Sequence, residues 1–163
     1  SEASVFNGGG NNRYYKGQIA EILYYKNRTF TSFELNKIQT NLALKYGITL
    51  KMADDPATAA TDERSYHASD NSVIWDYTAN AGYANHLAGI GLDVNSAFDK
   101  QKARSTAPDN AVSIDLGAPV ANDLNFLIWG GDGGSISTTT SADVPSGVLD
   151  RLERVYRVQE TGT

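Results

Sequence analysis

Residues 110–134, NAVSIDLGAPVANDLNFLIWGGDGG, contain the two patterns that decide the fold class. In the first part, apolar side chains at positions 112, 114 and 116 alternate with polar ones at 113 and 115, which is typical of a half-buried strand. In the second part, Phe126–Trp129 form a short unbroken apolar run, which favours a strand in the core. Turn-forming residues separate the two, so this stretch predicts short strands joined by turns.

Similar short segments occur on both sides of this stretch. They are NSVIWDYT (71–78), HLAGIGLD (86–93), FDKQKARS (98–105) and RVYRVQET (154–161). Strands at this spacing, separated by turn clusters, are typical of a sandwich. We therefore predict a mainly β fold, an antiparallel β-sandwich. The segment VLDRLERVYRV (148–158) fits a helix or a strand, and we favour a strand from Arg154 onward.

One amphipathic α-helix is expected, over about Ser32–Tyr46. Thr31 and Glu34 have the spacing of a capping box, and Gly47 can take the left-handed conformation that ends a helix. The expected apolar stripe is Leu35, Ile38, Leu42 and Tyr46, with Ala43 beside it, and the expected solvent face is Asn36, Lys37, Gln39, Asn41 and Lys45.

The segments that flank this helix both look like strands. GQIAEILYYKN (17–27) is apolar on both faces apart from Glu21, so it is predicted to be an inner strand covered on both sides. We interpret Glu21 as a rim or edge residue paired with an Arg or Lys such as Arg13, with a catalytic carboxylate as the alternative. ITLKM (48–52) is predicted to be a further strand.

Length and composition exclude several classes of protein. The chain has 163 residues, a mass of 17.6 kDa, a net charge of −5 and no cysteine. The acidic balance argues against nucleic-acid binding, and the missing cysteine excludes disulfides and thiolate metal sites. There are 13 Asp but only 6 Glu, which favours turns over helix. The chain contains no run of 18 apolar residues, so we expect no insertion into a membrane.

The polar segment 54–63 (DDPATAATDE) is the candidate domain boundary. It divides the chain into a strand–helix–strand segment, residues 1–51, and a β-sandwich module, residues 52–163. One composite or split domain is the alternative. Both ends of the chain look as though they continue into a longer polypeptide.

No catalytic site is predicted, and we expect no enzyme. Nucleophilic catalysis needs a base beside a nucleophile, and the only histidines are His67 and His86. Neither lies in a recognisable catalytic motif, so both are interpreted as structural.

The best metal candidate is the segment DVNSAFD, which contains Asp93, Asn95 and Asp99. Oxygen-rich loops suit calcium, although the glycine and distal glutamate of an EF-hand are missing. Weaker candidate carboxylates are Asp54, Asp55 and Asp62, and Asp132 in GGDGG; each is more simply a solvated turn residue.

Aromatic side chains are the candidates for a glycan site. Tyr14, Tyr15, Tyr77 and Tyr83 lie near predicted turns and could expose a ring to a sugar. Trp75 and Trp129 lie among apolar neighbours and are expected in the core.

Two blocks of sequence resemble parts of large bacterial surface proteins. Residues 14–50, YYKGQIAEILYYKNRTFTSFELNKIQTNLALKYGITL, resemble the closing segment of laminin-G-like, concanavalin-A-like jelly rolls. The remainder, with SVIWDYTANAGYANHLAGIGLD, DNAVSIDLG, LIWGGDGG and VPSGVLDRLERVYRVQETG, resembles a module of unknown function that follows that segment in very long Gram-negative adhesins of the repeats-in-toxin type.

The resemblance implies a secreted, non-catalytic module on the bacterial cell surface, with a structural or presenting role in cell adhesion or biofilm formation. Its partners would be the neighbouring domains of the same adhesin, in an arm that calcium rigidifies. The alternative is a glycan- or peptide-binding module, with calcium as a candidate cofactor.

Overall fold

The computed structural model of the chain describes residues 19–51, 57 and 62–162. Its helices are α1 (Ser32–Tyr46) and the short 3-10 helix η1 (Val94–Ser96). Its strands are β1 (Tyr66–His67), β2 (Val73–Trp75), β3 (Asn85–Asp93), β4 (Phe98–Lys100), β5 (Lys102–Arg104), β6 (Ser113–Asp115), β7 (Asn125–Gly131), β8 (Thr139–Thr140), β9 (Arg151–Leu152) and β10 (Tyr156–Thr161). The predicted fold class is confirmed: over the described residues the chain is mainly β, with antiparallel sheets and one α-helix.

The centre of the fold is a four-stranded antiparallel sheet in the order β10-β7-β3-β4. The predicted apolar run Phe126–Trp129 lies in β7, which pairs with β10 on one side and β3 on the other. Since side chains alternate across a strand, β7 supplies apolar groups to both faces of the sheet. Each face has its own hydrophobic cluster.

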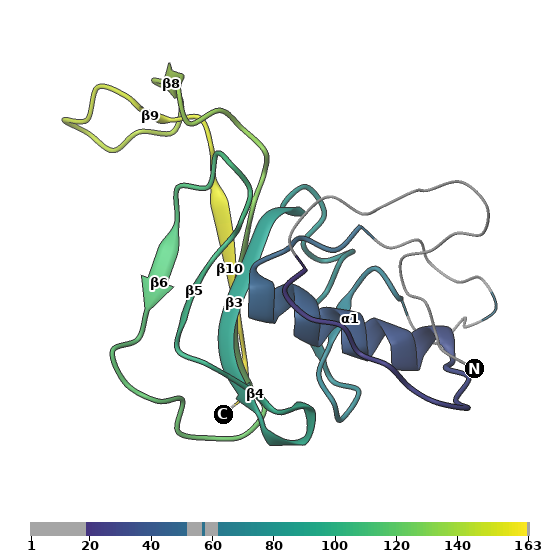
Figure 1. Cartoon of the computed structure of the whole chain (residues 1–163). Helices are drawn as coiled ribbons and strands as arrows, with labels where there is room; N and C mark the ends of the chain where they lie inside the picture. The colour runs from purple at the N-terminus through teal and green to yellow at the C-terminus, as the bar shows by residue number, and fades with distance from the viewer. Residues whose placement is uncertain (1–18, 52–56, 58–61, 163) are drawn as a thin grey trace.

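The two faces are covered by different layers (Figure 1). Phe126 and Ile128 pack in the cluster that includes Ala43 and Leu44 of α1 and residues of β1 and β2. Trp129 packs in the other cluster, with Ala103 of β5 and residues of β6 beside it. The helix therefore shares one core with strands that follow residue 62, across the expected boundary at residues 51–52.

Close backbone approach fixes the position of α1. Gly47 ends the helix in a left-handed conformation with φ 66°, and a Cβ there would overlap the carbonyl oxygen of Arg104 in β5. A Cβ at Gly89 of β3 would lie 3.1 Å from Leu44 and 2.9 Å from Ile128. Glycine at these two positions lets the helix lie close to the sheet.

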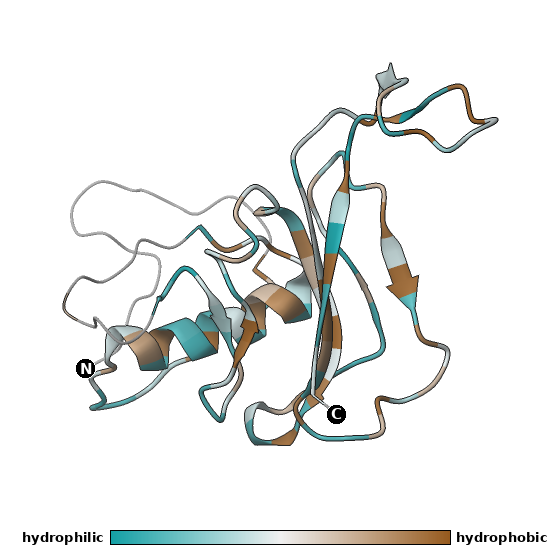
Figure 2. Cartoon of the chain, turned by 180° about the vertical axis from the view of Figure 1, so that it is seen from behind, coloured by the Kyte–Doolittle hydropathy of each residue, from teal (hydrophilic) through white to brown (hydrophobic). Residues whose placement is uncertain are grey.

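The helix begins and ends as predicted, but its buried face differs from the prediction. The capping box between Thr31 and Glu34 is present, and α1 spans Ser32–Tyr46. Its buried residues are Asn36, Thr40, Ala43 and Leu44, whereas Leu35 of the expected apolar stripe is 41% exposed. Placing Asn36 on the solvent face was therefore wrong. The mixture of apolar and polar residues around α1 is visible in Figure 2.

The predicted inner strand at residues 17–27 is also wrong over its described part. Residues 19–25 are extended but pair with no strand in the described structure, and they expose large apolar side chains. Apolar character on both faces makes a strand only where other strands lie alongside it, and no described strand pairs with this segment. Residues 48–51 likewise form no strand, and Met52 lies outside the described residues.

The remaining predicted strands are found with two refinements. FDKQKARS is two strands, β4 and β5, because the chain turns at Gln101 and passes from the central sheet to the covering layer. The favoured strand after Arg154 is confirmed as β10. Between β7 and β10 the chain extends away from the body as an arm with β8 and β9, where Leu149 is 88% exposed.

Candidate functional site

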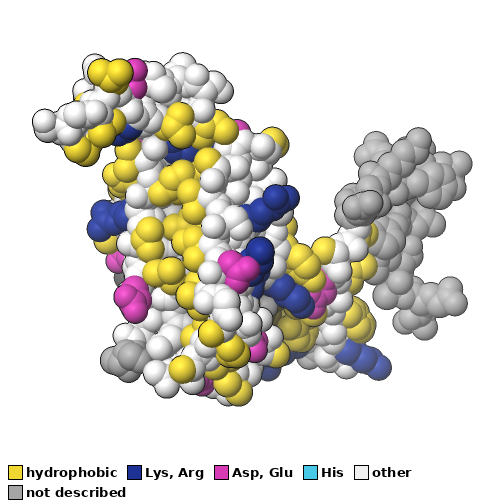
Figure 3. All heavy atoms as spheres, turned by 90° about the vertical axis from the view of Figure 1, so that its left-hand side faces the viewer, with side chains coloured by type: hydrophobic (Ala, Val, Ile, Leu, Met, Phe, Trp, Pro, Cys, Tyr) yellow, Lys and Arg dark blue, Asp and Glu magenta, His cyan; other side chains and the backbone are white. Residues whose placement is uncertain are grey.

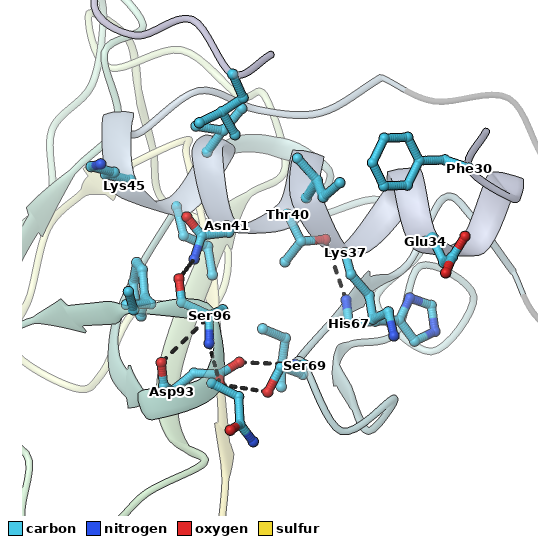
Figure 4. Close-up of a pocket in the computed structure, with 18 of the residues that line it drawn as sticks. Phe30, Glu34, Lys37, Thr40, Asn41, Lys45, His67, Ser69, Asp93 and Ser96 are labelled. Atoms are coloured by element: carbon cyan, nitrogen blue, oxygen red, sulfur yellow. Dashed lines mark hydrogen bonds between the residues drawn. The ribbon is translucent and has the colours of Figure 1, made fainter. Parts of the chain in front are cut away.

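A groove of about 480 Å³ runs alongside α1, and we call it the helix groove (Figure 4). Leu23 and Tyr25 of the extended segment line it, together with Ile38 and Leu42 of the helix. Part of the predicted apolar stripe thus faces the segment that precedes the helix. Asp93, Asn95 and Ser96, at the turn between β3 and β4, line the groove as well.

On the sheet side of the helix groove, buried polar side chains fix α1 to β1 and to the residues just before it. Asn36 Nδ2 donates to the carbonyl oxygens of Glu63 and Ser65, at 2.6 and 2.9 Å. Its Oδ1 lies 2.9 Å from Nδ1 of His67, and the next turn of α1 adds Thr40, whose hydroxyl accepts from the backbone N–H of His67. This arrangement fixes α1 to β1 by directional bonds as well as by packing.

His67 is a structural residue of this joint. The amide nitrogen of Asn36 already donates to two carbonyls, so its oxygen must accept the proton on His67 Nδ1. The neutral imidazole satisfies that bond. Burial lowers the pKa of His67, partly opposed by a backbone hydrogen bond at Ser65.

The three predicted calcium ligands lie along the turn between β3 and β4, but not in equivalent surroundings. Asp93 is 2% exposed. Its carboxylate accepts from the backbone N–H and hydroxyl of Ser69, at 2.8 and 2.6 Å, and from the backbone N–H of Ser96 at 3.2 Å. Asn95 and Asp99 are exposed, and Asp99 does not line the groove. Asp93 thus caps η1 and ties it to the segment after β1.

Within the described parts of the chain, no cluster of three or more His, Asp or Glu side chains is placed to hold a metal ion. Calcium binding by Asp93, Asn95 and Asp99 stays a prediction. Of the weaker candidates, Asp62 pairs with Arg64 and Asp132 accepts the backbone N–H groups of Gly134 and Val155. Asp54 and Asp55 lie outside the described residues.

The extended segment is tied to α1 by Glu21. Its Oε2 accepts from Nζ of Lys45 and from the hydroxyl of Tyr46, both at 2.7 Å. The hydrogen bond from Lys45 is the main cause of the lowered pKa of Glu21. Glu21 therefore is exposed and paired with a lysine, one of the two residue types expected from the sequence. Arg13, the example named there, lies outside the described residues.

A second polar cluster joins the loop after β5 to the start of β10. Asp109 accepts from Nε2 of His86 at 2.7 Å and forms an ion pair with Arg154, whose guanidinium also donates to the carbonyl oxygens of Gly134 and Asp109. The bonds from Arg154 and His86 lower the pKa of Asp109 to about 2. Among the described residues, neither imidazole hydrogen-bonds to a serine or threonine hydroxyl.

The two tryptophans lie where they were expected, whereas the two described candidate tyrosines differ from each other. Trp75 and Trp129 are buried, at 1% and 0% exposure. Tyr77 is 37% exposed, whereas Tyr83 packs partly against the core. Tyr14 and Tyr15 lie outside the described residues.

Sequence reasoning missed Asn36 and the Arg154–Asp109 pair. One signal for Asn36 was present: Asn36, Thr40, Ala43 and Gly47 recur at helical spacing and are small or polar, which suits a face that lies close to a sheet. The Arg154–Asp109 pair joins residues 45 positions apart, and no local pattern announces it.

Comparison with known protein families identifies the family of this chain. A family described as a domain of unknown function (DUF8202) matches residues 34–163. The chain belongs to this family. The DUF8202 region begins in the first turn of α1 and includes every described strand, while the extended segment 19–25 precedes it. Neither a curated protein nor a solved structure matches the chain.

In the described residues, no helix is long and apolar enough to cross a membrane.

Proposed function

We propose that this chain is a non-catalytic, extracellular module of a bacterial surface adhesin, and that it holds a neighbouring domain of the same polypeptide against its helix. The resemblance of its two sequence blocks to adhesin segments supports the setting. Its role in adhesion or biofilm formation is to present adjacent ligand-binding domains at a fixed geometry.

This proposal rests on a set of exposed apolar side chains just before α1 and in its first turn, which we call the outer apolar surface. It consists of Ile19, Ile22, Leu23, Tyr24, Tyr25 and Leu35, which are 41–72% exposed. Contiguous exposed apolar groups mark interaction sites. Figure 1 shows the extended segment passing in front of the helix. Leu23 and Tyr25 of this surface also line the helix groove.

The position of this surface favours a neighbouring domain as its occupant. The extended segment lies before the start of the family region and is anchored by the bonds of Glu21 to Lys45 and Tyr46. A linker that joins two domains and is fixed to one of them would be anchored in this way, through side-chain bonds to the domain that follows it. A rigid anchor on α1 would keep the preceding domain at a constant angle to the sheet.

Photo-crosslinking tests the proposal in the natural polypeptide that contains this chain. A photoreactive amino acid at position 24, where the tyrosine is 72% exposed, should form an intramolecular crosslink to the adjacent domain. The control is the same group at position 149, where the leucine is 88% exposed on the arm. Equal or weaker crosslinking to the neighbour from position 24 would contradict the proposal.

A second candidate function is glycan or peptide binding. The observation that favours it is an aromatic-lined hollow beside Tyr77, on a different part of the body from the outer apolar surface.

A further inference from the structure

A pocket of about 460 Å³ is formed by three parts of the chain: residues 50–51, the β1–β2 hairpin and the start of β3. We call it the aromatic pocket. Tyr66 and Trp75 line it and are each 1% exposed, so they form a fixed apolar wall. Lys51, Tyr77 and Asn85 line its more open side. A hollow of this volume with a few polar groups on an apolar wall is the usual form of a small-ligand site.

Three polar side chains of the aromatic pocket have no side-chain hydrogen bond or ion pair within the described structure. The ammonium of Lys51, the hydroxyl of Tyr77 and the side-chain amide of Asn85 make no hydrogen bond or ion pair within the described structure. Arg64 differs, since Asp62 binds its guanidinium with two bonds of 2.8 and 2.9 Å. Among the described residues that line the pocket, Lys51 is therefore a positive charge without an ion-pair partner.

The ring of Tyr77 is held in position for stacking. The guanidinium carbon of Arg64 lies 4.6 Å from the ring centroid, and the backbone N–H of Tyr77 donates to the hydroxyl of Ser65 at 3.0 Å. With 37% of the residue exposed, the ring offers apolar surface at the mouth of the pocket. A flat apolar ring suits the C–H face of a pyranose, because both surfaces are poorly hydrated.

We propose that the aromatic pocket binds a small acidic sugar of the hexuronate class. The pyranose ring packs on Tyr77, the sugar hydroxyls exchange hydrogen bonds with the Asn85 amide and the Tyr77 hydroxyl, and the carboxylate pairs with Lys51. The volume accommodates one or two sugar units. This inference deepens the second candidate function and does not depend on the outer apolar surface.

Titration of the ¹⁵N-labelled chain with glucuronate, followed by NMR, tests the proposal, with glucose as the neutral comparison. Saturable shifts are expected at the amides of residues 51, 64–66, 75–77 and 84–87. Lys51→Gln should weaken glucuronate binding about tenfold, the usual scale for a lost charge-assisted bond, and leave glucose binding unchanged. The matched control is Lys102→Gln, which removes the same charge from β5, where Lys102 pairs with Asp115.

The ring and the hydroxyl of Tyr77 can be separated by two variants. Tyr77→Phe should keep most of the binding, whereas Tyr77→Ala should abolish it, at an unchanged melting temperature. No saturable shift up to tens of millimolar sugar, or shifts confined to other residues, would overturn both the inference and glycan binding. Equal binding of glucose and glucuronate, insensitive to Lys51→Gln, would overturn the acidic-sugar assignment and leave glycan binding standing.

Discussion

Oδ1 of Asn36 and Nδ1 of His67 lie 2.9 Å apart, and both side chains are buried between α1 and β1. The bond joins a helix residue to a strand residue 31 positions further along the chain. Through this pair the helix is fixed in one rotational setting, with its small and polar face on the sheet and part of its apolar stripe turned outward. In this setting Leu35, in the first turn of α1, is exposed and contributes to the outer apolar surface.

Replacing Asn36 should destabilise the whole body. Asn36→Leu leaves two buried carbonyls and the His67 imidazole without their partner, and we expect a loss of about 2–4 kcal/mol in the free energy of unfolding. Urea denaturation measures this loss. The control is Asn41→Leu, which removes one bond to the carbonyl of Ser96 and should cost less than half as much. Equal costs for the two variants would contradict the role of Asn36.

The neutral state of His67 should make stability depend on pH. Burial lowers its pKa in the folded state, so the unfolded chain binds the proton more readily. Its contribution is fully present above about pH 6.5, the value of a free histidine, and is lost as the pH falls below 6.5 through the lowered folded pKa. Melting temperatures between pH 8 and 5 measure the effect. His67→Gln should flatten this part of the curve, and His86→Gln should keep the contribution of His67. An unchanged slope in His67→Gln would contradict the assignment.

Much of the backbone could be predicted from local patterns. The capping box at Thr31 and Glu34 and the glycine at position 47 are local signals, and they define both ends of α1. The apolar run of β7 predicts a core strand because it is apolar at every position. The orientation of the helix was not predictable from hydrophobicity, because Asn36 is buried by bonds to residues that are distant in sequence.

The segment 19–25 shows a second limit of sequence reasoning. Its apolar pattern indicates a strand covered on both faces, yet whether a strand forms depends on partners that the segment does not contain. The aromatic pocket was missed for a related reason. Lys51, Tyr77 and Asn85 belong to three separate segments, and only the fold brings them to one hollow.

Asp93 should stabilise the fold whether or not calcium binds. Its carboxylate already accepts three bonds from Ser69 and Ser96, so Asp93→Ala should lower the free energy of unfolding by about 2 kcal/mol in the presence of a chelator. Asp99→Ala, at an exposed position, should change it by less than about 0.5 kcal/mol. Melting temperatures with calcium and with chelator test the predicted calcium site, and equal values would contradict it. A melting temperature raised by calcium and lost in both variants would instead establish the calcium site.

Glu21 should control the anchoring of the extended segment without affecting global stability. Glu21→Gln weakens the bonds to Lys45 and Tyr46 at a solvent-exposed position. Limited proteolysis should then cut residues 19–28 faster, while the melting temperature stays the same. Arg28→Gln is the control, because Arg28 pairs with Glu34 and leaves the Glu21 bonds intact. Unchanged cleavage in Glu21→Gln would show that other contacts hold the segment.

The central claim, that a neighbouring domain covers the outer apolar surface, is tested most directly by hydrogen exchange at the backbone amides of residues 19–25. These amides make no strand pairing in the described structure, so they should exchange rapidly in the isolated chain. In the natural polypeptide with its adjacent domains, the account predicts that their exchange slows by at least tenfold, while the amides of β7 exchange equally in both. Equally rapid exchange of residues 19–25 in the two forms would contradict it.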